Sequence, residues 1–196
     1  MKNIVIIGCG SGIGLATAKQ LQNEVQIIRI SRTETPELNN IKLHFYQKDI
    51  LTDSLDDVSF PEKIDGLVYA PGSINLKPFG RLSEEDFKKD FEINVLGAIK
   101  IIQKLLPNLK KSESASVVLF STVATKLGMP FHSSIAASKS AVAPSLSDTN
   151  LATALLASPE KREAAAKRHP LQKIGNPEEI AKMVVFLLSD SSSWIT

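Results

Sequence analysis

Short apolar runs rich in β-branched residues alternate with longer amphipathic patterns along this chain. Continuous apolar runs bounded by turns are typical of strands buried on both faces of a parallel sheet. Five such runs are predicted to be strands, over residues 4–7, 25–30, 43–46, 67–70 and 117–121. Because helical patterns separate them, the chain is predicted to form a Rossmann-type doubly wound parallel α/β sheet with right-handed crossovers.

Several of the predicted helices have clear start signals. One follows the first strand directly, over 12–23. A long helix begins after Ser83, a suitable N-cap with Asp86 three residues later, and Pro107 is predicted to mark its end. A last helix begins at Asn176, where a cap residue precedes a proline and two acids. Shorter helices are predicted over 151–157 and 160–168.

The long helix carries one apolar face with period three to four and further apolar residues beside it. The face is formed by Phe87, Phe91, Val95, Ala98, Ile102, Leu105 and Leu109. The residues beside it are Ile93, Leu96, Ile99 and Ile101. Either other layers of the same chain cover these additional residues, or they face a second subunit, and the sequence leaves both explanations open.

Composition narrows the class of protein. The 196 residues have 43% hydrophobic residues and a formal net charge of +2, which indicate an ordinary globular chain forming a single domain over 1–196. Such a charge argues against a general nucleic-acid binder. No apolar run reaches 18 residues, so no membrane span is predicted. The single cysteine, Cys9, excludes a multi-cysteine zinc site, and no metal site is predicted. A chain with one cysteine also suits a reducing compartment, so we expect a cytoplasmic location.

A glycine-rich loop lies between the first strand and the first helix. Its spacing is G-x-x-x-G-x-G, on Gly8, Gly12 and Gly14, with Ser11 and Ile13 between them. Glycines let the backbone turn sharply, and the amides that open the helix then point at an anion such as a pyrophosphate. The alternative is a plain tight turn. Both the G-x-G-x-x-G pattern and the P-loop pattern fail here.

Together with motifs further along the chain, this loop resembles the short-chain dehydrogenase/reductase family of NAD(P)-dependent oxidoreductases. Asp49 and Ile50 resemble the residues that hold adenine after the third strand, and Ala70 and Gly72 stand in the turn after the fourth. Ala143-Pro144-Ser145 and Thr149 resemble a segment near the nicotinamide. The resemblance implies a cofactor-binding role for these residues.

The same resemblance implies catalytic roles for Asn94, Thr122 and Lys139, with Lys139 also contacting the cofactor ribose. The family moves a hydride between nicotinamide and a small carbonyl or alcohol, and a tyrosine four residues before the lysine supplies the proton. This chain has Ile135 there, thirteen residues after Thr122 as the family spacing requires. Isoleucine has no proton to donate. Other candidates for the acid are His132, which otherwise reads as a partly exposed loop residue, and Lys139 itself.

The end of the second strand bears on the choice of cofactor. An adenine ribose 2′-hydroxyl is recognised by a carboxylate, whereas a 2′-phosphate is recognised by arginine. Ser31 and Arg32 stand where NAD-dependent members place an aspartate, which favours NADP(H). NAD(H) stays possible, because Glu34 follows closely and Arg32 could be a solvated strand-end cation.

Two functions therefore remain open. The first is an NADP(H)-dependent oxidoreductase with an altered proton donor. The second is a catalytically degenerate NADP(H)-binding protein with a sensing or scaffolding role. The resemblance implies a homodimer or homotetramer in either case, and it makes 145–170 a segment that covers the substrate.

The family pattern also predicts more chain than this sequence has. The helix carrying Lys139 runs directly into Ala143 and Pro144, which leaves no room for a sixth strand, and a last strand is expected after Thr196. One hypothesis is that the physical molecule contains residues absent from this sequence. The alternative is a true deletion that leaves sheet edges unpaired.

Overall fold

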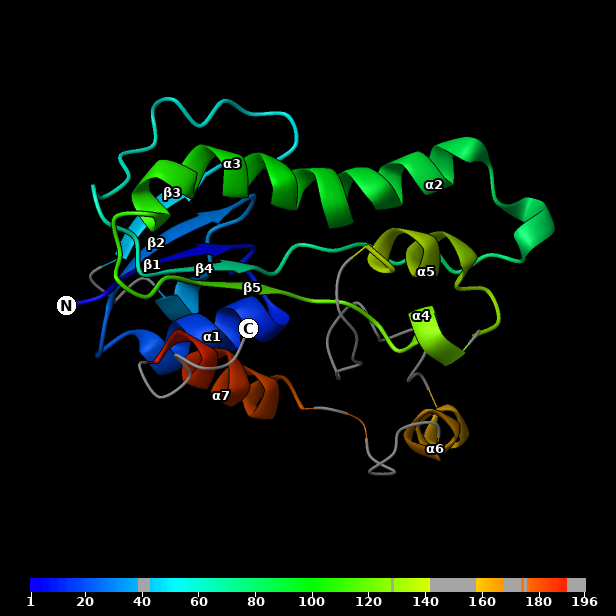
Figure 1. Cartoon of the computed structure of the whole chain (residues 1–196). Helices are drawn as coiled ribbons and strands as arrows, with labels where there is room; N and C mark the ends of the chain where they lie inside the picture. The colour runs from blue at the N-terminus through cyan, green and yellow to red at the C-terminus, as the bar shows by residue number, and fades with distance from the viewer. Residues whose placement is uncertain (39–42, 128, 142–157, 168–173, 175, 190–196) are drawn as a thin grey trace.

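Five parallel strands form one sheet, whose order is β3-β2-β1-β4-β5 (Figure 1). The computed structural model describes residues 1–38, 43–127, 129–141, 158–167, 174 and 176–189. The strands are β1 (Asn3–Ile7), β2 (Gln26–Ser31), β3 (Leu43–Gln47), β4 (Gly66–Tyr69) and β5 (Ser116–Leu119). All five predicted strands are present, with bounds moved by one or two residues. β1 pairs with both β2 and β4, which places it at the centre.

Helices cover both faces of this sheet, so the predicted doubly wound α/β fold is confirmed. α1 (Gly12–Leu21) and α7 (Pro177–Leu188) lie on one face, and α2 (Glu84–Phe91), the π-helical turn η3 (Glu92–Leu96) and α3 (Gly97–Leu109) lie on the other (Figure 1). The remaining helices are η1 (Pro36–Leu38), η2 (Phe79–Arg81), α4 (Ala124–Leu127), α5 (Ser133–Lys139) and α6 (Pro159–Lys167).

The predicted long helix is continuous but irregular. Its start has the expected capping box: the Ser83 hydroxyl accepts from the Asp86 N–H at 3.2 Å, and the Asp86 carboxylate accepts from the Ser83 N–H at 3.0 Å. The prediction that Pro107 ends the helix is wrong, because α3 continues to Leu109. A proline inside the final turn removes only its own N–H, and the Lys110 N–H still reaches the Leu106 carbonyl at 3.0 Å.

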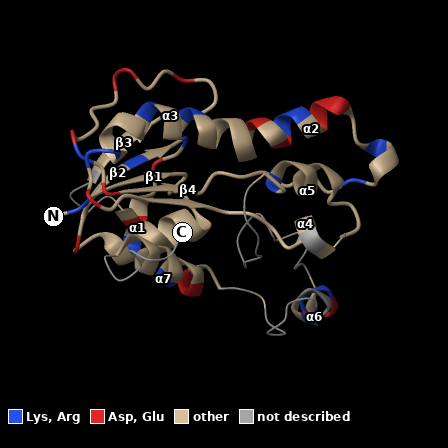
Figure 2. Cartoon of the chain, in the orientation of Figure 1, with Lys and Arg blue, Asp and Glu red and all other residues tan. Residues whose placement is uncertain are grey.

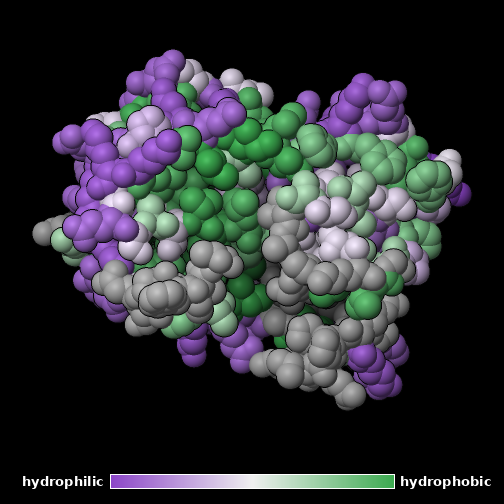
Figure 3. Space-filling model, in the orientation of Figure 1, coloured by the Kyte–Doolittle hydropathy of each residue, from purple (hydrophilic) through white to green (hydrophobic). Residues whose placement is uncertain are grey.

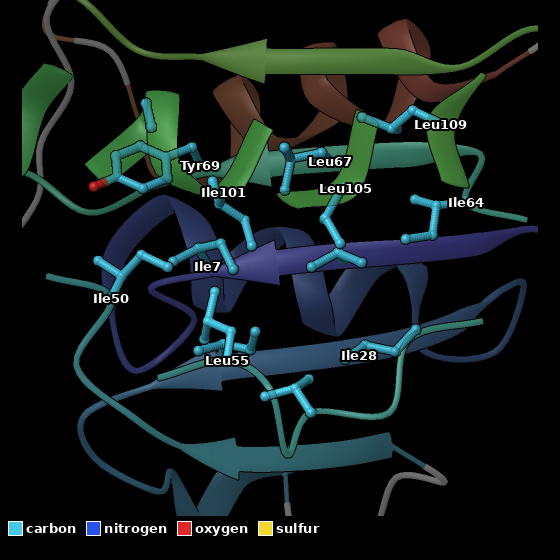
Figure 4. Packing of buried hydrophobic residues seen from close by; sticks show 14 residues of the cluster. Ile7, Ile28, Ile50, Leu55, Ile64, Leu67, Tyr69, Ile101, Leu105 and Leu109 are labelled. Carbon is cyan, nitrogen blue, oxygen red and sulfur yellow. The ribbon is translucent and has the colours of Figure 1, made fainter. Parts of the chain in front are cut away.

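Each face of the sheet carries its own hydrophobic core. On the α3 side, residues of β1, β2 and β4 pack against Ile101 and Leu105 of the helix (Figure 4). On the other side, Ile4, Ile6, Ile27 and Val68 pack against α1 and α7. Strands covered on both faces are what the continuous apolar runs predicted.

The chain itself covers only some of the apolar residues along the long helix. Ile101 is fully buried inside the chain, whereas Leu96, Ile99 and Leu106 are exposed. Val117 of β5 is exposed as well, and Figure 3 shows apolar surface over α3 and the neighbouring sheet edge. Part of this helix is therefore covered by the chain itself and part is left on the surface.

Most charged residues belong to helices and loops rather than to the strands (Figure 2). Lys88, for example, pairs with Glu84 one turn earlier at 2.7 Å. Of the residues that the structure describes, none belongs to a helix long and apolar enough to cross a membrane. The junction at Ala143 and Pro144, where the sequence leaves no room for a sixth strand, and the chain end at Thr196, after which a last strand was expected, both lie outside the described residues.

Two isoleucines on α3 provide a test of this packing. Ile101→Ala is expected to lower the free energy of unfolding by about 2–5 kcal/mol, because it leaves a cavity against β1 and β4. Ile99→Ala, on the exposed side of the same helix, is expected to change it by less than about 1 kcal/mol. Urea unfolding measures both, and equal losses for the two variants would contradict the described core.

Candidate functional site

A cavity of about 560 Å³ opens where the carboxyl ends of the strands meet. It lies outside β1 and β4, at the point where the strand order reverses, which is where open α/β sheets bind ligands. Its walls come from segments far apart in the sequence: Ile7, Gly8, Gly10–Ile13, Ile30–Thr33, Lys48–Leu51, Ala70–Ile74, Ile93, Phe120–Thr122, Ile135 and Lys139. The volume lies within the range of small-molecule and cofactor sites.

The glycine loop forms one wall and requires its glycines. Gly8 and Gly12 have φ of 80° and 57°, in the left-handed region that favours glycine. A Cβ on Gly8 would lie 2.9 Å from the Pro71 nitrogen, and a Cβ on Gly14 would overlap the Gly8 carbonyl oxygen. Ser11 is the N-cap of α1, but its side chain makes no capping hydrogen bond. The first amides of α1 are therefore available to an anion.

The ends of β2 and β3 form one end of the cavity, where Arg32 and Asp49 lie. Arg32 is exposed and forms no ion pair with any described residue, and Gln47 donates to its backbone carbonyl at 3.0 Å. The Ser31 hydroxyl donates to the Thr33 carbonyl at 2.6 Å, so its proton is already used in a hydrogen bond within the loop after β2. Asp49 accepts from the Leu51 N–H at 2.9 Å.

A buried arginine lies behind this end of the cavity. Arg29 of β2 is 3% exposed, stacks over the Phe45 ring at 4.9 Å, and has two N–H groups without a hydrogen-bond partner. Burial raises the pKa of the neighbouring Cys9 thiol, against the opposing effect of Arg29. The thiol is therefore neutral, and Arg29 and Arg32 give this end a positive field.

The opposite end contains Thr122, Ile135 and Lys139 in one wall. The Lys139 ammonium donates to the Phe120 carbonyl at 2.7 Å, and the Ser121 hydroxyl donates to the Lys139 carbonyl at 2.7 Å. These bonds join the end of β5 to α5. Burial lowers the pKa of Lys139 to about 8, while the negative charge of Asp90 opposes that shift. We call this part of the cavity the reaction end.

A network of buried polar groups lies behind the reaction end. The Asp90 carboxylate accepts from the Ser73 hydroxyl at 2.5 Å and from the Ser134 hydroxyl. The Asn94 side-chain amide donates to the Ser73 hydroxyl at 3.1 Å and to the Asp90 carbonyl at 2.8 Å. Its Oδ1 atom is buried without a partner and faces Gly72, beside which Lys139 also lies. An unpaired buried acceptor costs about 1–3 kcal/mol, so this arrangement favours a polar ligand.

The structure brings most of the predicted site residues together. On the cavity wall lie Gly8, Ser11, Gly12, Ile13, Ser31, Arg32, Asp49, Ile50, Ala70, Gly72, Thr122 and Lys139. Gly14 lies beneath the Gly8 carbonyl and Asn94 lies behind Gly72, so neither is on the wall itself. Pro144 and Thr149 lie outside the described residues, as does most of the segment 145–170.

His132, a candidate proton donor, and Tyr69 each have a polar atom engaged with a backbone carbonyl. His132 is buried rather than partly exposed, because its ring packs at the start of α5 and Nδ1 lies 2.6 Å from the Pro130 carbonyl. It does not line the cavity. Tyr69 donates to the Ile93 carbonyl at 2.6 Å, and burial raises its pKa. Neither side chain is placed to protonate a ligand in this cavity.

The sequence reasoning missed the roles of Ser73, Asp90 and Ser134. The available signal was local: Asp90 stands four residues before Asn94, one helical turn away on the same side. Nothing in the sequence indicated that a serine of α5 would reach it.

Comparison with known proteins places these features in context. The profile of the short chain dehydrogenase family matches residues 2–154, and a profile described as enoyl-(acyl carrier protein) reductase matches 140–196. The 3-oxoacyl-(acyl-carrier-protein) reductase FabG of Thermotoga maritima is 28% identical over 232 positions, covering 100% of this chain and 93% of the reductase.

Two solved structures show the same fold. One is 4-hydroxyisoleucine dehydrogenase complexed with NADH, with a TM-score of 0.86 and 22% identity. The other is ElxO with NADP bound, with a TM-score of 0.81 and 22% identity. Each comparison covers 100% of this chain and 94% of the other.

The alignment with the Thermotoga maritima reductase bears on chain length. It spans 232 positions and takes in all 196 residues of this chain, so the reductase has residues at 36 positions where this chain has none. Residues lying between aligned parts of the two chains are therefore missing here relative to that protein.

The contact beneath the glycine loop provides a test. Gly14→Ala is expected to lower the free energy of unfolding by about 1–3 kcal/mol, because the added methyl group overlaps the Gly8 carbonyl. Helix propensity alone would predict the opposite change, a higher free energy of unfolding, because alanine favours helix more than glycine does. Gly80→Ala, where a Cβ meets nothing within 4 Å, is the control and is expected to change it by about 0.5 kcal/mol or less. A Gly14→Ala protein as stable as the unmodified chain would refute the close approach.

Proposed function

This chain belongs to the short chain dehydrogenase family, and we propose that it is an NADP(H)-dependent oxidoreductase acting on a small carbonyl or alcohol. The observation that supports this most directly is the continuous cavity that joins the glycine loop at one end to Thr122, Ile135 and Lys139 at the other. A dinucleotide laid along it would place its phosphates at the start of α1 and its nicotinamide at the reaction end.

The positive field at the β2 end supports NADP(H) over NAD(H). Arg32 lies on the cavity wall without an ion pair among the described residues, and the buried Arg29 adds charge behind it. Glu34, the carboxylate that could have served a ribose hydroxyl, is exposed and does not line the cavity. The solved relatives hold NADH in one case and NADP in the other, so the preference depends on the residues of each chain.

The remaining polar groups of the reaction end suit the roles that the family resemblance implies. The cofactor, when bound, supplies or accepts the hydride. Thr122 would donate a hydrogen bond to the substrate oxygen. Lys139 would hold the nicotinamide ribose, and the unpaired Asn94 Oδ1 would accept from a water or a ligand hydroxyl.

The residue at position 135 bears on whether this protein catalyses hydride transfer or only binds the cofactor. Ile135 lies on the cavity wall, one helical turn before Lys139, where the family carries its tyrosine. An isoleucine keeps the wall apolar and removes the usual acid, so the proton must come from another group. A protein that binds NADP(H) without turnover is the second candidate function, and this substitution is the observation that favours it.

The same proposal includes three features of the intact protein. Segment 145–170 would cover the substrate, and the location would be cytoplasmic. The exposed apolar side chains of Leu96 in η3 and of Ile99 and Leu106 in α3 support a homodimer or homotetramer formed through this long helix.

The cofactor preference is tested with Arg32→Ala. Loss of a charge-assisted contact to the 2′-phosphate is expected to weaken NADPH binding by on the order of 10- to 100-fold while changing NADH binding little. Isothermal titration calorimetry with both nucleotides measures this ratio. Arg81→Ala, which changes an exposed arginine outside the cavity, is the control. An equal loss for both nucleotides would argue against a 2′-phosphate contact, and no binding of either to the unmodified protein would refute the proposal.

The missing acid is tested with a matched pair of variants. Ile135→Tyr is expected to raise the rate of NADPH oxidation with a panel of small carbonyls, toward the 10²- to 10⁴-fold that a positioned general acid contributes. Ile135→Phe fills the same space without a hydroxyl and is expected to give no increase. Equal rates for the two variants would show that the hydroxyl has no access to the substrate oxygen.

A further inference from the structure

We propose that Lys139 donates the proton to the substrate oxygen, and that Asp90 is the positioning residue that keeps the Lys139 ammonium charged at the cavity wall. The inference rests on the proposed function, because a proton donor needs a substrate. It assigns the step that Ile135 cannot perform.

Lys139 is the one described side chain at the reaction end that can exchange a proton near neutral pH. The other protic groups there are the hydroxyls of Ser73, Ser121 and Thr122, which hold their protons unless a base removes them. Those of Ser73 and Ser121 already donate to Asp90 and to the Lys139 carbonyl. Arg32, Lys48 and Asp49 also line the cavity, but they come from the ends of β2 and β3 at its opposite end.

Only one of the three N–H donors of the Lys139 ammonium is used by a described residue. One of its three N–H bonds is directed to the Phe120 carbonyl at 2.7 Å, which fixes Nζ beside the end of β5. Two N–H bonds are then free for the cavity, because an ammonium carries three donors. Lys139 can in this way hold a ribose hydroxyl and face the substrate oxygen together.

Asp90 lies in the buried polar network behind the reaction end, where its charge acts on Lys139. Its carboxylate is 2% exposed and is held by two serine hydroxyls, Ser73 from the loop after β4 and Ser134 from α5. No described cation forms an ion pair with it, so its negative charge is left to act on Lys139 through a poorly solvated interior. Because Ser134 and Lys139 share α5, the bond from Ser134 also fixes the helix that carries the ammonium (Figure 1).

The charged groups around Lys139 set the direction of its titration. Burial lowers the pKa of Lys139 to about 8, and Asp90 of α2 raises it against that effect. The other described neighbours that contact it or lie beside it are neutral: the Phe120 carbonyl, just after β5, and the Asn94 amide of η3. Removing the Asp90 charge is therefore expected to lower the pKa further, and the ammonium would be lost at a lower pH.

The proton step balances with these groups. In carbonyl reduction the cofactor supplies the hydride to the carbonyl carbon. One Nζ–H bond of Lys139 breaks, an O–H bond forms at the substrate oxygen, and the electron pair of the broken bond stays on Nζ. Lys139 becomes a neutral amine, and a proton from water restores the ammonium. In alcohol oxidation the neutral amine accepts the hydroxyl proton instead.

The first experiment follows the Lys139 side chain without any cofactor. Protein labelled with ¹³C-lysine is titrated by NMR, and the Lys139 signal is identified by its loss in Lys139→Arg. The pKa is expected to lie well below the usual lysine value of about 10.4. Asp90→Asn is expected to move it further down, and Glu92→Gln, which removes an exposed charge from the adjoining turn, is expected to leave it unchanged. An ordinary lysine value in the unmodified protein overturns the proposal whether or not the variants fold.

The second experiment measures turnover. Lys139→Arg keeps the positive charge but no transferable proton, so NADPH should still bind while carbonyl reduction falls by on the order of 10²-fold or more. In the unmodified enzyme kcat/KM for reduction should fall as pH rises through the Lys139 pKa, and in Asp90→Asn this fall should begin at lower pH. Ser134→Ala keeps the Asp90 carboxylate, so kcat/KM should fall at the same pH as in the unmodified enzyme.

The two proposals fail in different ways. A shifted Lys139 titration in a protein that binds NADPH but reduces no carbonyl overturns the oxidoreductase function and the donor role with it. Full activity in Lys139→Arg, or a pH profile that ignores Asp90→Asn, overturns the present inference and leaves the oxidoreductase function standing.

Discussion

The close approach of helix α1 to the ends of β1 and β4 is the constraint on which the rest of this structure depends. Gly14 lies against the Gly8 carbonyl, and Gly8 lies against Pro71, so no side chain fits between these segments. The approach places the first turn of α1 at the point where the strand order reverses. One cavity can then reach from the helix amides to the end of β5. The positions of the site residues around it depend on this close approach.

The two ends of the cavity are built from different parts of the chain. The ends of β2 and β3 carry Arg32 and Asp49, whereas β5 and α5 carry Thr122, Ile135 and Lys139. A change in the chemistry at one end need not disturb binding at the other. The glycine loop and the wall formed by Thr122, Ile135 and Lys139 therefore depend on different local contacts.

The reaction end retains polar groups that a folded core would normally exclude. Asp90 is a buried carboxylate without an ion pair among the described residues, and Asn94 keeps an unpaired oxygen. Asn94 lies within the π-helical turn Glu92–Leu96 and Asp90 lies just before it, and such an irregularity frequently marks functional sites. Burying such groups is unfavourable by a few kcal/mol, so their presence in one cluster beside Lys139 is better explained by the site than by stability.

The sequence by itself determined the strands, their parallel arrangement and the glycine turn, because these follow from local patterns: continuous apolar runs, capping residues and a glycine spacing. Most of the site residues named from the sequence and the family resemblance line the cavity. Only the tertiary structure decided what the polar side chains contact. It buried His132 away from the cavity, bonded Tyr69 to the backbone of η3, and joined Asp90 to Ser134 across 44 residues. Such contacts depend on how α2 and α5 pack together, and no periodicity within either helix records which side chains meet between them.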